Sequence, residues 1–402
     1  MAVSQRKQLG AWYTPPALVR AVVAQAVGPR ARRVLDPACG DGRFLAAAAQ
    51  AIGPAARLTG VDVDLPTVER ARRDPALAEL GEWVHGDALA MDWTGRAFDV
   101  VVGNPPFLSQ LAVATTRGGS SRFGGGPYAD AAAEFLALAV QLVGPGGRVG
   151  LVLPQSLLAA RDAATIRAAV STLAALRWMW WSPTLMFDAN VRTWAGVWEV
   201  GAEQGQVQRE FGPSFEVLRP IAMPSVWSGL IADASRPPAE GERTLGDVAV
   251  FTADFRDQYY GLVGAVADDA DGPPLVTSGL IEPDRCLWGE RPVRFAKQRF
   301  TAPRVDLALL SPSMQTWARR RLVPKILIAN QTRTIEAVHD ERGEWLPGVP
   351  VITCTSDQPG EVLRVLQSPA ATDWVRYHAA GSGLSAGTIR LTARLLASIP
   401  LP

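Results

Sequence analysis

Cysteine and histidine are both scarce in this chain of 402 residues, which contains three of each. Cys39, Cys286 and Cys354 lie far apart in the sequence, so they match neither a disulfide framework nor the spacing of zinc ligands. Three scattered histidines do not supply a His-rich metal site either. We therefore expect no metal centre.

Long apolar runs are absent as well. No stretch reaches the length that a membrane-spanning helix needs, and the first ten residues, MAVSQRKQLG, are too polar for a secretory signal. These absences predict a cytoplasmic protein without a membrane partner. The length predicts two domains of ordinary size, each with its own core.

Lysine is rare, with three among the forty basic residues, and the net charge is only +1. The distribution of charge is more informative than its sum. From Arg285 to Arg333 there are eleven Lys and Arg residues against two acids, Glu290 and Asp306. A basic stretch in a neutral chain is typical of a surface that meets a polyanion, and equally of a solvated surface with many ion pairs.

Short apolar runs alternate with helical stretches in the first half. Strands are expected at 34–38, 57–64, 82–88, 98–103 and 148–154, with two more at 178–181 and 193–200. This alternation predicts an α/β fold with a doubly wound, mostly parallel, Rossmann-like sheet of seven strands. The polar, Gly-rich segment 201–215 is interpreted as a linker. We expect domains at 1–204 and 205–402, the second of α+β type.

Four polar motifs, DPACGDG, GVDVD, GDA and GNPPF, follow strand ends, where such sheets bind ligands. Gly40 and Gly42 let the backbone approach a ligand closely. Asp62 and Asp87 could accept hydrogen bonds from a ribose and an adenine, although each alone could be a turn residue. The spacing is not GxGxxG, and Asp36 would repel a pyrophosphate. The loop therefore favours a cationic ligand such as S-adenosylmethionine over a dinucleotide.

The motif GNPPF ends the apolar run FDVVVG at an amide, two prolines and a ring. An aromatic amine becomes a better nucleophile when acceptors engage both its N–H bonds. The Asn104 side-chain carbonyl and the Pro105 main-chain carbonyl could be those acceptors, and Pro106 would restrict residue 105 to extended conformations. Phe107 could stack on a flat target, which must be flipped out of a duplex. An ordinary Asn-Pro turn is the simpler alternative.

These motifs resemble those of the gamma-class N6-adenine DNA methyltransferases of the Taq type. The shared features are the Asn-Pro-Pro-aromatic tetrapeptide, a preceding Tyr-Thr-Pro-Pro segment, the DPACGxGxF loop, the later acids and a C-terminal recognition domain. The resemblance covers essentially the whole chain and is strongest over residues 8–200. It implies that the target base lies between Phe107 and Phe187, and that S-adenosylmethionine contacts Tyr13, Thr14, Pro15, Asp36, Ala38, Gly40, Asp62, Asp87, Ala88, Asn104 and Phe135.

The same resemblance implies a double-stranded DNA partner for the C-terminal half. The glycine-rich loop 115–128 lies just past the corner, and its Arg117 and Arg122 could clamp the backbone of the flipped nucleotide or could equally belong to a disordered insertion. The phosphate contacts implied for the basic stretch are Arg291, Arg294, Lys297, Arg299, Arg319, Arg320, Arg321 and Lys325. A monomer is expected, with a separate restriction endonuclease or another defence component as a conceivable partner.

Other functions fit part of the pattern. The tetrapeptide also serves methyltransferases that act on RNA bases or on a glutamine amide of a protein. A non-catalytic DNA-binding relative is a further alternative, although the intact corner and acids argue against it. The favoured prediction is a site-specific, adenine-specific DNA methyltransferase that uses S-adenosylmethionine.

Overall fold

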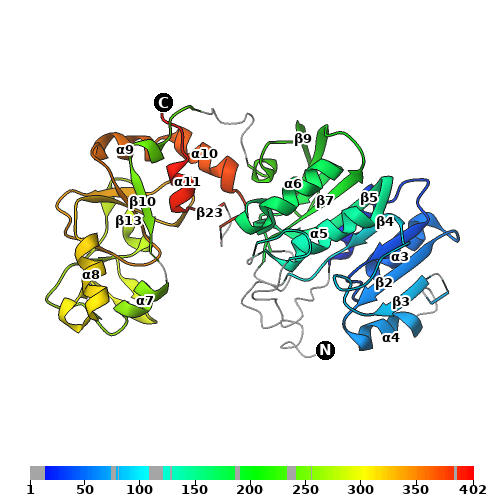
Figure 1. Ribbon diagram of the computed structural model, residues 1–402, viewed down its shortest axis with the longest axis horizontal. Coiled ribbons are helices and arrows are strands. Elements are labelled where there is room, and N and C mark those ends of the chain that lie inside the picture. Colours follow the sequence, from blue (N-terminus) through cyan, green and yellow to red (C-terminus); the bar gives the residue numbers. More distant parts are fainter. Residues whose placement is uncertain are drawn as a thin grey trace. The chain divides into compact units, whose positions relative to one another are not determined.

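The computed structural model describes residues 14–73, 78–79, 81–107, 121–126, 129–185, 191–232, 241–254, 256–383 and 387–402. The chain forms two compact units, Met1–Leu230 and Ile231–Pro402 (Figure 1). Among the described residues, no helix is both long enough and apolar enough to span a membrane.

A nine-stranded sheet organises the first unit, in the order β3-β2-β1-β4-β5-β7-β6-β8-β9. Its strands are β1 (Arg33–Asp36), β2 (Arg57–Asp62), β3 (Gly81–His85), β4 (Phe98–Gly103), β5 (Val143–Pro154), β6 (Ala174–Trp181), β7 (Thr193–Val200), β8 (Gln206–Phe211) and β9 (Glu216–Ala222). Strands β1 to β5 run parallel to one another, whereas β7 runs antiparallel to both β5 and β6. The predicted doubly wound α/β sheet is confirmed.

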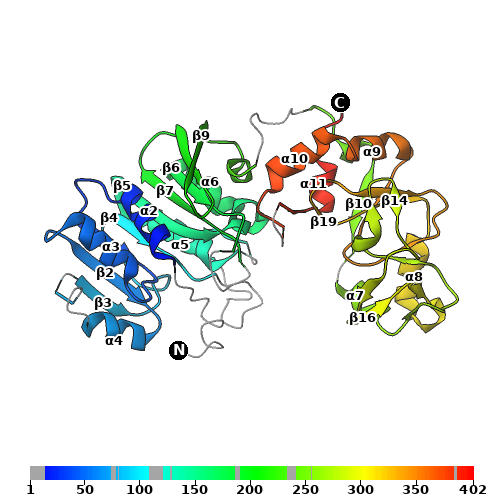
Figure 2. The same cartoon turned by 180° about the vertical axis from the view of Figure 1, so that it is seen from behind.

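Helices cover both faces of this sheet. The helices of the unit are α2 (Pro16–Ala26), α3 (Arg43–Ile52), α4 (Leu65–Arg73), α5 (Ala131–Leu142) and α6 (Ala164–Leu173). Apolar residues of α2, α3 and α4 form one core with side chains of the central strands. Helices α5 and α6 contact each other and cover the opposite face, in front of the sheet in Figure 1, whereas α2 and α3 come forward in Figure 2.

The strand directions decide where polar loop residues gather. Because β1, β2, β3 and β4 are parallel, their carboxyl ends share one edge of the sheet. Pro154 at the end of β5 pairs with Thr193 at the start of β7. The residue that precedes β7 therefore lies at this same edge.

The linker predicted at 201–215 is wrong. Residues Gln206–Phe211 form β8, which pairs in parallel with β6, and Glu216–Ala222 form β9 at the edge of the sheet. Most residues of β8 and all residues of β9 are partly or fully exposed, so their sequence lacks the apolar alternation of a half-buried strand. The first unit consequently continues to Leu230, past the boundary expected after Gln204.

The second unit is built from short strands and five helices longer than a single turn among its described residues. An antiparallel sheet, in the order β10-β22-β18-β20, consists of Val250–Ala253, Ile352–Thr355, Lys325–Ile328 and Ala337–Asp340. The two-stranded pairings are β11 (Val266–Ala267) with β17 (Arg304–Val305), β12 (Leu275–Val276) with β21 (Leu346–Pro347), β13 (Ile281–Glu282) with β14 (Arg285–Cys286), β15 (Val293–Phe295) with β16 (Gln298–Phe300) and β19 (Gln331–Thr332) with β23 (Ile389–Arg390). The helices are α7 (Arg256–Leu262), α8 (Pro312–Arg321), α9 (Pro359–Leu366), α10 (Pro369–Ala379) and α11 (Ala393–Ala397).

Strand β18 separates two apolar cores in this unit. Ile326 and Ile328 pack with residues of α9, α10 and α11, whereas Leu327 packs on the other side with residues of β12, β15 and α8. This division follows from the two-residue periodicity of a strand. The predicted α+β character is therefore present, in a unit with two separate apolar cores.

A buried ion pair marks the first residue of β18. The Lys325 ammonium donates to Asp340 Oδ2 at 2.5 Å, and their side chains are 1% and 3% exposed. Asp340 also accepts the main-chain N–H groups of Glu344 and Trp345, each at 3.0 Å. Burial lowers the pKa of Lys325, and the Asp340 carboxylate opposes that shift. The pair fixes the register of β18 against β20 and the turn that follows β20.

Replacement of Lys325 by alanine should destabilise the second unit by about 3–5 kcal/mol, because Asp340 would remain as an uncompensated buried charge. Chemical unfolding monitored by tryptophan fluorescence would measure the change. The control is Arg342→Ala, which removes an 82% exposed arginine whose one ion pair among the described residues is a long contact of 3.9 Å with Glu344. The two variants should differ clearly, and equal stabilities would contradict this role for Lys325.

Candidate active site

The loop between β1 and α3 carries the motif DPACGDG, in which the cofactor site is predicted. Main-chain bonds from Cys39 to the Val61 carbonyl and from Gly42 to the Cys39 carbonyl, each 2.8 Å, fold it against β2. Gly40 and Gly42 have φ values of +52° and +77°, and Gly42 immediately precedes the first residue of α3. Positive φ values favour glycine, which explains both positions in the motif.

Asp62, at the end of β2, holds this loop in place. One carboxylate oxygen accepts the Gly40 N–H at 2.8 Å, and the other accepts the Asp64 N–H at 2.9 Å. Burial raises the pKa of Asp62, while the N–H donors of Asp64 and Gly40 oppose the shift. Asp62 therefore has a structural task beside the ribose contact predicted for it.

Asp36 is the most enclosed acid of the site, with 1% exposure. Its Oδ1 accepts the Ala38 N–H at 3.1 Å. Burial raises the pKa of Asp36 well above its usual range, and the negative charges of Asp62 and Asp41 add to that rise. A cation beside this carboxylate would offset the cost of burying its charge.

Gly103 brings the end of β4 into contact with Asp36. A methyl group built on Gly103 would lie 2.6 Å from Asp36 Oδ1, which is closer than a carbon atom can approach. Only glycine permits this approach, and Asn104 follows at once. The predicted catalytic corner and the predicted cofactor loop are therefore adjacent in the structure.

The corner itself has one firmly buried member. Pro105 is buried, whereas Asn104, Pro106 and Phe107 are partly exposed. The Phe107 ring packs against the core shared by α2 and α3. This arrangement anchors the turn and leaves Asn104 and Phe107 partly exposed at the carboxyl edge of the sheet, although the Asn104 side-chain oxygen itself is buried.

Arg43, which the sequence motifs did not single out, joins the loop to the segment before α2. Its guanidinium donates to the main-chain oxygen of Thr14, and its Nε donates to Asp41 Oδ1 at 2.9 Å. Thr14 is 2% exposed, and Pro15 precedes the first residue of α2. The available signal was a basic residue directly after GDG, where it can reach back across the loop.

The turn after β3 lies at the same edge. Asp87 is exposed and accepts the Leu89 N–H at 3.0 Å, and Ala88 is 2% exposed. Arg122 donates to the Leu89 carbonyl at 2.7 Å, so it lies beside this turn. Phe135 is buried within α5. Tyr13, Arg117 and Phe187 lie outside the described residues.

The basic residues of the second unit divide into two groups. Lys325 and Arg321 are corrections to the predicted phosphate contacts. Lys325 is buried in its pair with Asp340, and Arg321 forms a two-bond pair with Asp254, at 2.9 and 2.6 Å, with a side chain only 19% exposed. Both cations are therefore already paired with aspartates of the same unit.

The other six basic candidates are accessible. Arg291 pairs with Glu282 but remains 48% exposed, and Arg319 and Arg320 are exposed at the end of α8. The hairpin of β15 and β16 carries Arg294 opposite Arg299, with Lys297 in its turn, and all three are exposed. Within the described part of the chain, these three cations have no ion pair.

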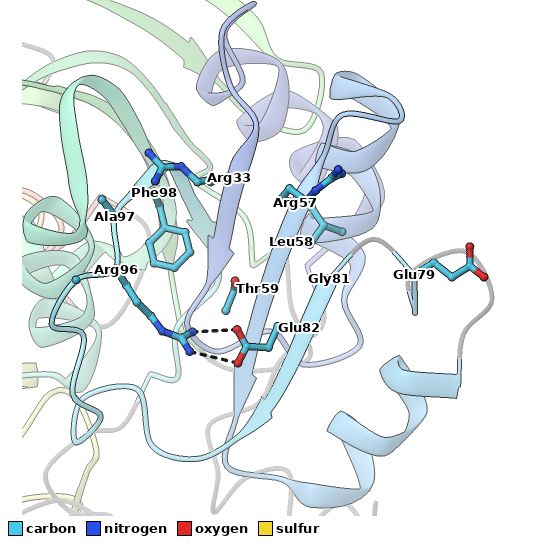
Figure 3. Close-up of a pocket in the computed structure, with 11 residues that line it drawn as sticks. Arg33, Arg57, Leu58, Thr59, Glu79, Gly81, Glu82, Arg96, Ala97 and Phe98 are labelled. Atoms are coloured by element: carbon cyan, nitrogen blue, oxygen red, sulfur yellow. Dashed lines mark hydrogen bonds and ion pairs between the residues drawn. The ribbon is translucent and has the colours of Figure 1, made fainter.

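A hollow of about 520 Å³ lies at the opposite edge of the sheet (Figure 3). It is lined by the first residues of four strands, Arg33, Arg57, Gly81 and Phe98. Its charges are largely paired, since Arg96 contacts both oxygens of Glu82 and Arg33 contacts Asp99. The hollow is therefore separate from the motifs at the carboxyl ends of the strands.

Comparison with known proteins places the fold and the family. The solved structure of the type IIL restriction-modification enzyme MmeI in complex with DNA superposes with a TM-score of 0.62, at 13% identity, over 98% of this chain and 69% of that chain. The likeness and the sheet order define an S-adenosylmethionine-dependent methyltransferase fold followed by a second domain. Residues 1–197, just under half of the chain, match the N-6 DNA Methylase family.

Curated relatives match parts of the chain. The type II methyltransferase M.TthHB8I of Thermus thermophilus is 30% identical over 184 residues, which are 40% of this chain and 38% of that protein. A demethylmenaquinone methyltransferase of Staphylococcus aureus is 33% identical over 69 residues, 17% of this chain and 29% of that protein. The matches thus span well under half the length of either relative.

Asp36→Asn should flatten the pH dependence of stability. An acid whose pKa is higher in the folded than in the unfolded protein stabilises the fold while it is protonated. This stabilisation is lost as the pH rises from the unfolded pKa, near 3.8, through the raised folded pKa. Above that window, the ligand-free Asp36→Asn protein should unfold at a higher temperature than the parent, because position 36 no longer carries a buried charge. Calorimetry across pH would measure this, and a variant less stable than the parent at every pH would contradict it.

Proposed function

We propose that this protein transfers a methyl group from S-adenosylmethionine to the N6 amino group of a flipped-out adenine in double-stranded DNA. One observation carries the proposal. The corner Asn104–Phe107 follows β4 directly at Gly103, and Gly103 touches the buried Asp36 of the Gly-rich loop. An amine-orienting turn and an acid-lined cofactor loop thus share one edge of the sheet.

The residues of the loop suit S-adenosylmethionine. This group would supply an electrophilic methyl carbon and carries an ammonium and a sulfonium but no phosphate. Asp36, desolvated beside Asp62 and Asp41, favours such a cationic ligand and disfavours a dinucleotide. Ala38 and Gly40 would line the bound molecule, Asp62 would hold its ribose and Asp87 its adenine.

The corner would act by positioning and electrostatics. The Asn104 and Pro105 carbonyl oxygens would accept the two N–H bonds of the target amine, so that its lone pair is directed away from the aromatic ring. Phe107 would stack on the base. As the amine nitrogen forms its bond to the methyl carbon, the S–CH3 bond of the sulfonium would break to leave a neutral thioether, and one amine proton would pass to water. No strong base is required, and preorganised acceptors of this kind account for rate factors of about 100 to 1,000.

The first unit would be the catalytic domain and the second the target recognition domain. The family match of residues 1–197 supports the first assignment, and the accessible cations of the second unit support the other. The type II methyltransferase and the type IIL restriction-modification enzyme among the relatives support a role in DNA modification, in which a separate nuclease is a conceivable partner.

The substrate can be tested directly. Tritiated S-adenosylmethionine would be incubated with unmethylated bacterial DNA, with total RNA and with a protein extract, and labelled DNA would be digested to nucleosides for mass spectrometry. N6-methyladenine in DNA would support the proposal, and sequencing would then give the site. Label confined to RNA or protein would overturn the substrate but retain the amine chemistry.

Asn104→Ala should reduce methyl transfer at least about 100-fold while S-adenosylmethionine still binds, since an amine acceptor is removed and the other predicted cofactor contacts remain. Asp62→Ala should mainly weaken cofactor binding, because the Gly40 and Asp64 N–H groups lose the carboxylate that accepts their hydrogen bonds. Calorimetric titration and single-turnover rates would separate the two effects. Full activity in Asn104→Ala would exclude the proposed role of the corner.

The double substitution Arg294→Ala, Arg299→Ala should weaken DNA binding about equally for all sequences and reduce the salt slope of log K by about 1 for each phosphate that is no longer neutralised. Fold stability should hold, because like charges opposite each other in a hairpin do not stabilise it. Arg364→Ala is the control, since Arg364 is 67% exposed in the same unit. An unchanged salt slope in the double variant would exclude the hairpin from the DNA interface.

A further inference from the structure

Arg192 lies at the edge of the sheet that carries the catalytic corner. It immediately precedes β7, whose first residue, Thr193, pairs with Pro154 at the carboxyl end of β5. On the other side of β5, Gly103 of β4 pairs with Leu151. Arg192 and Asn104 are therefore separated by two strand spacings across the sheet, about 10 Å, and by three residues along the strands, about another 10 Å. A nucleotide with its base at Asn104 and an extended arginine side chain can together bridge such a distance.

The backbone at Arg192 is held rigidly. Its carbonyl accepts the Gln155 N–H at 2.8 Å. The Gln155 side chain is 5% exposed, and its amide donates to the carbonyls of Thr193 at 3.1 Å and Ser182 at 3.2 Å. The base of the Arg192 side chain is thus fixed in position by contacts on both sides.

The Arg192 guanidinium, in contrast, has no partner among the described residues. Its Nε is buried and makes no hydrogen bond. Burial lowers the pKa of Arg192, and no neighbouring carboxylate opposes the shift. A buried cationic N–H left without an acceptor is energetically costly.

Three other arginines of the first unit either have hydrogen-bond partners or are exposed to solvent. Arg167 donates to the carbonyls of Leu157 at 2.8 Å and Ala160 at 2.7 Å, and Arg43 is held by Asp41 and Thr14. Arg161 is 80% exposed and lies 3.6 Å from Asp162. Arg192 alone among these four combines a buried nitrogen with a missing acceptor. This combination indicates a ligand that accepts hydrogen bonds and carries negative charge.

We propose that Arg192 binds a backbone phosphate of the target strand, next to the nucleotide whose base lies at Asn104. This inference rests on the proposed function, which supplies a polyanionic substrate at this edge. A guanidinium binds phosphate with two parallel, charge-assisted hydrogen bonds, which suits a residue that must fix the orientation of a strand. Arg192 is then a substrate-binding residue on the catalytic domain, separate from the cations of the second unit.

The test compares Arg192→Ala, Arg192→Lys and the control Arg161→Ala, which removes the same charge from an exposed side chain at the same edge. Binding of a fluorescein-labelled single-stranded oligodeoxyadenylate would be measured by anisotropy over a range of salt concentrations. Arg192→Ala should bind about tenfold more weakly, and its slope of log K against log salt should be smaller by about 0.7, the value for one phosphate of a single strand. Arg192→Lys should recover most of the affinity, and Arg161→Ala should match the parent.

Two further measurements make the outcome unambiguous. Cofactor affinity and the unfolding temperature should be unchanged in Arg192→Ala, while KM for DNA rises in the methylation assay. Weaker cofactor binding with normal oligonucleotide binding would overturn the proposal, because Arg192 would then serve the carboxylate of the cofactor. Parent-like affinity and salt slope in Arg192→Ala would overturn it as well.

The outcomes also separate this inference from the proposed function. Loss of oligonucleotide affinity in Arg192→Ala, with a parent protein that methylates no DNA, would support the phosphate contact and reject the DNA methyltransferase reaction. N6-methyladenine formation by the parent, with no effect of Arg192→Ala, would do the reverse. A parent protein that binds no oligonucleotide would overturn this inference, whereas the methylation assay on double-stranded DNA would still decide the proposed function.

Discussion

The burial of two carboxylates in one loop is the constraint on which the site depends. Asp36 and Asp62 end neighbouring parallel strands, and main-chain N–H groups of the loop between β1 and α3 bind both. These bonds fix the loop, but the raised pKa of each acid shows that they do not fully offset the cost of burial. The remaining cost is the physical reason to expect a cation in this place.

The same constraint extends to the corner. A residue with a side chain at position 103 would collide with Asp36, so the end of β4 can approach the loop only as glycine. The position of Asn104 is therefore set by the cofactor loop as much as by its own two prolines. A distortion at Asp36 would therefore also displace Gly103 and the adjacent Asn104, which would couple the proposed cofactor and target sites.

Much of this was predictable from the sequence, because the decisive residues follow buried strands. The ends of β4 and β7 match their predicted positions, and β2 ends two residues earlier than expected, at Asp62. The edge strands β8 and β9 could not be recognised, because a strand with largely exposed faces has no alternating apolar pattern. Lys325 and Arg321 resembled phosphate ligands because their acidic partners, Asp340 and Asp254, are distant in the sequence.

Two cations of the basic stretch 285–333, Arg321 and Lys325, form ion pairs within the fold, and this narrows the set of candidate phosphate contacts. Once Lys325 and Arg321 are assigned to the interior, the exposed cations concentrate on the end of α8 and on the β15–β16 hairpin. In that hairpin Arg294 faces Arg299 across the strands, an arrangement that opposes folding. A fold gains nothing from such a pair in the absence of an anion, whereas a phosphate placed between the two guanidinium groups would turn their repulsion into binding energy. If the proposed function holds, a nucleic-acid backbone would account both for the local electrostatic cost at the hairpin and for the unpaired nitrogen of Arg192 in the first unit.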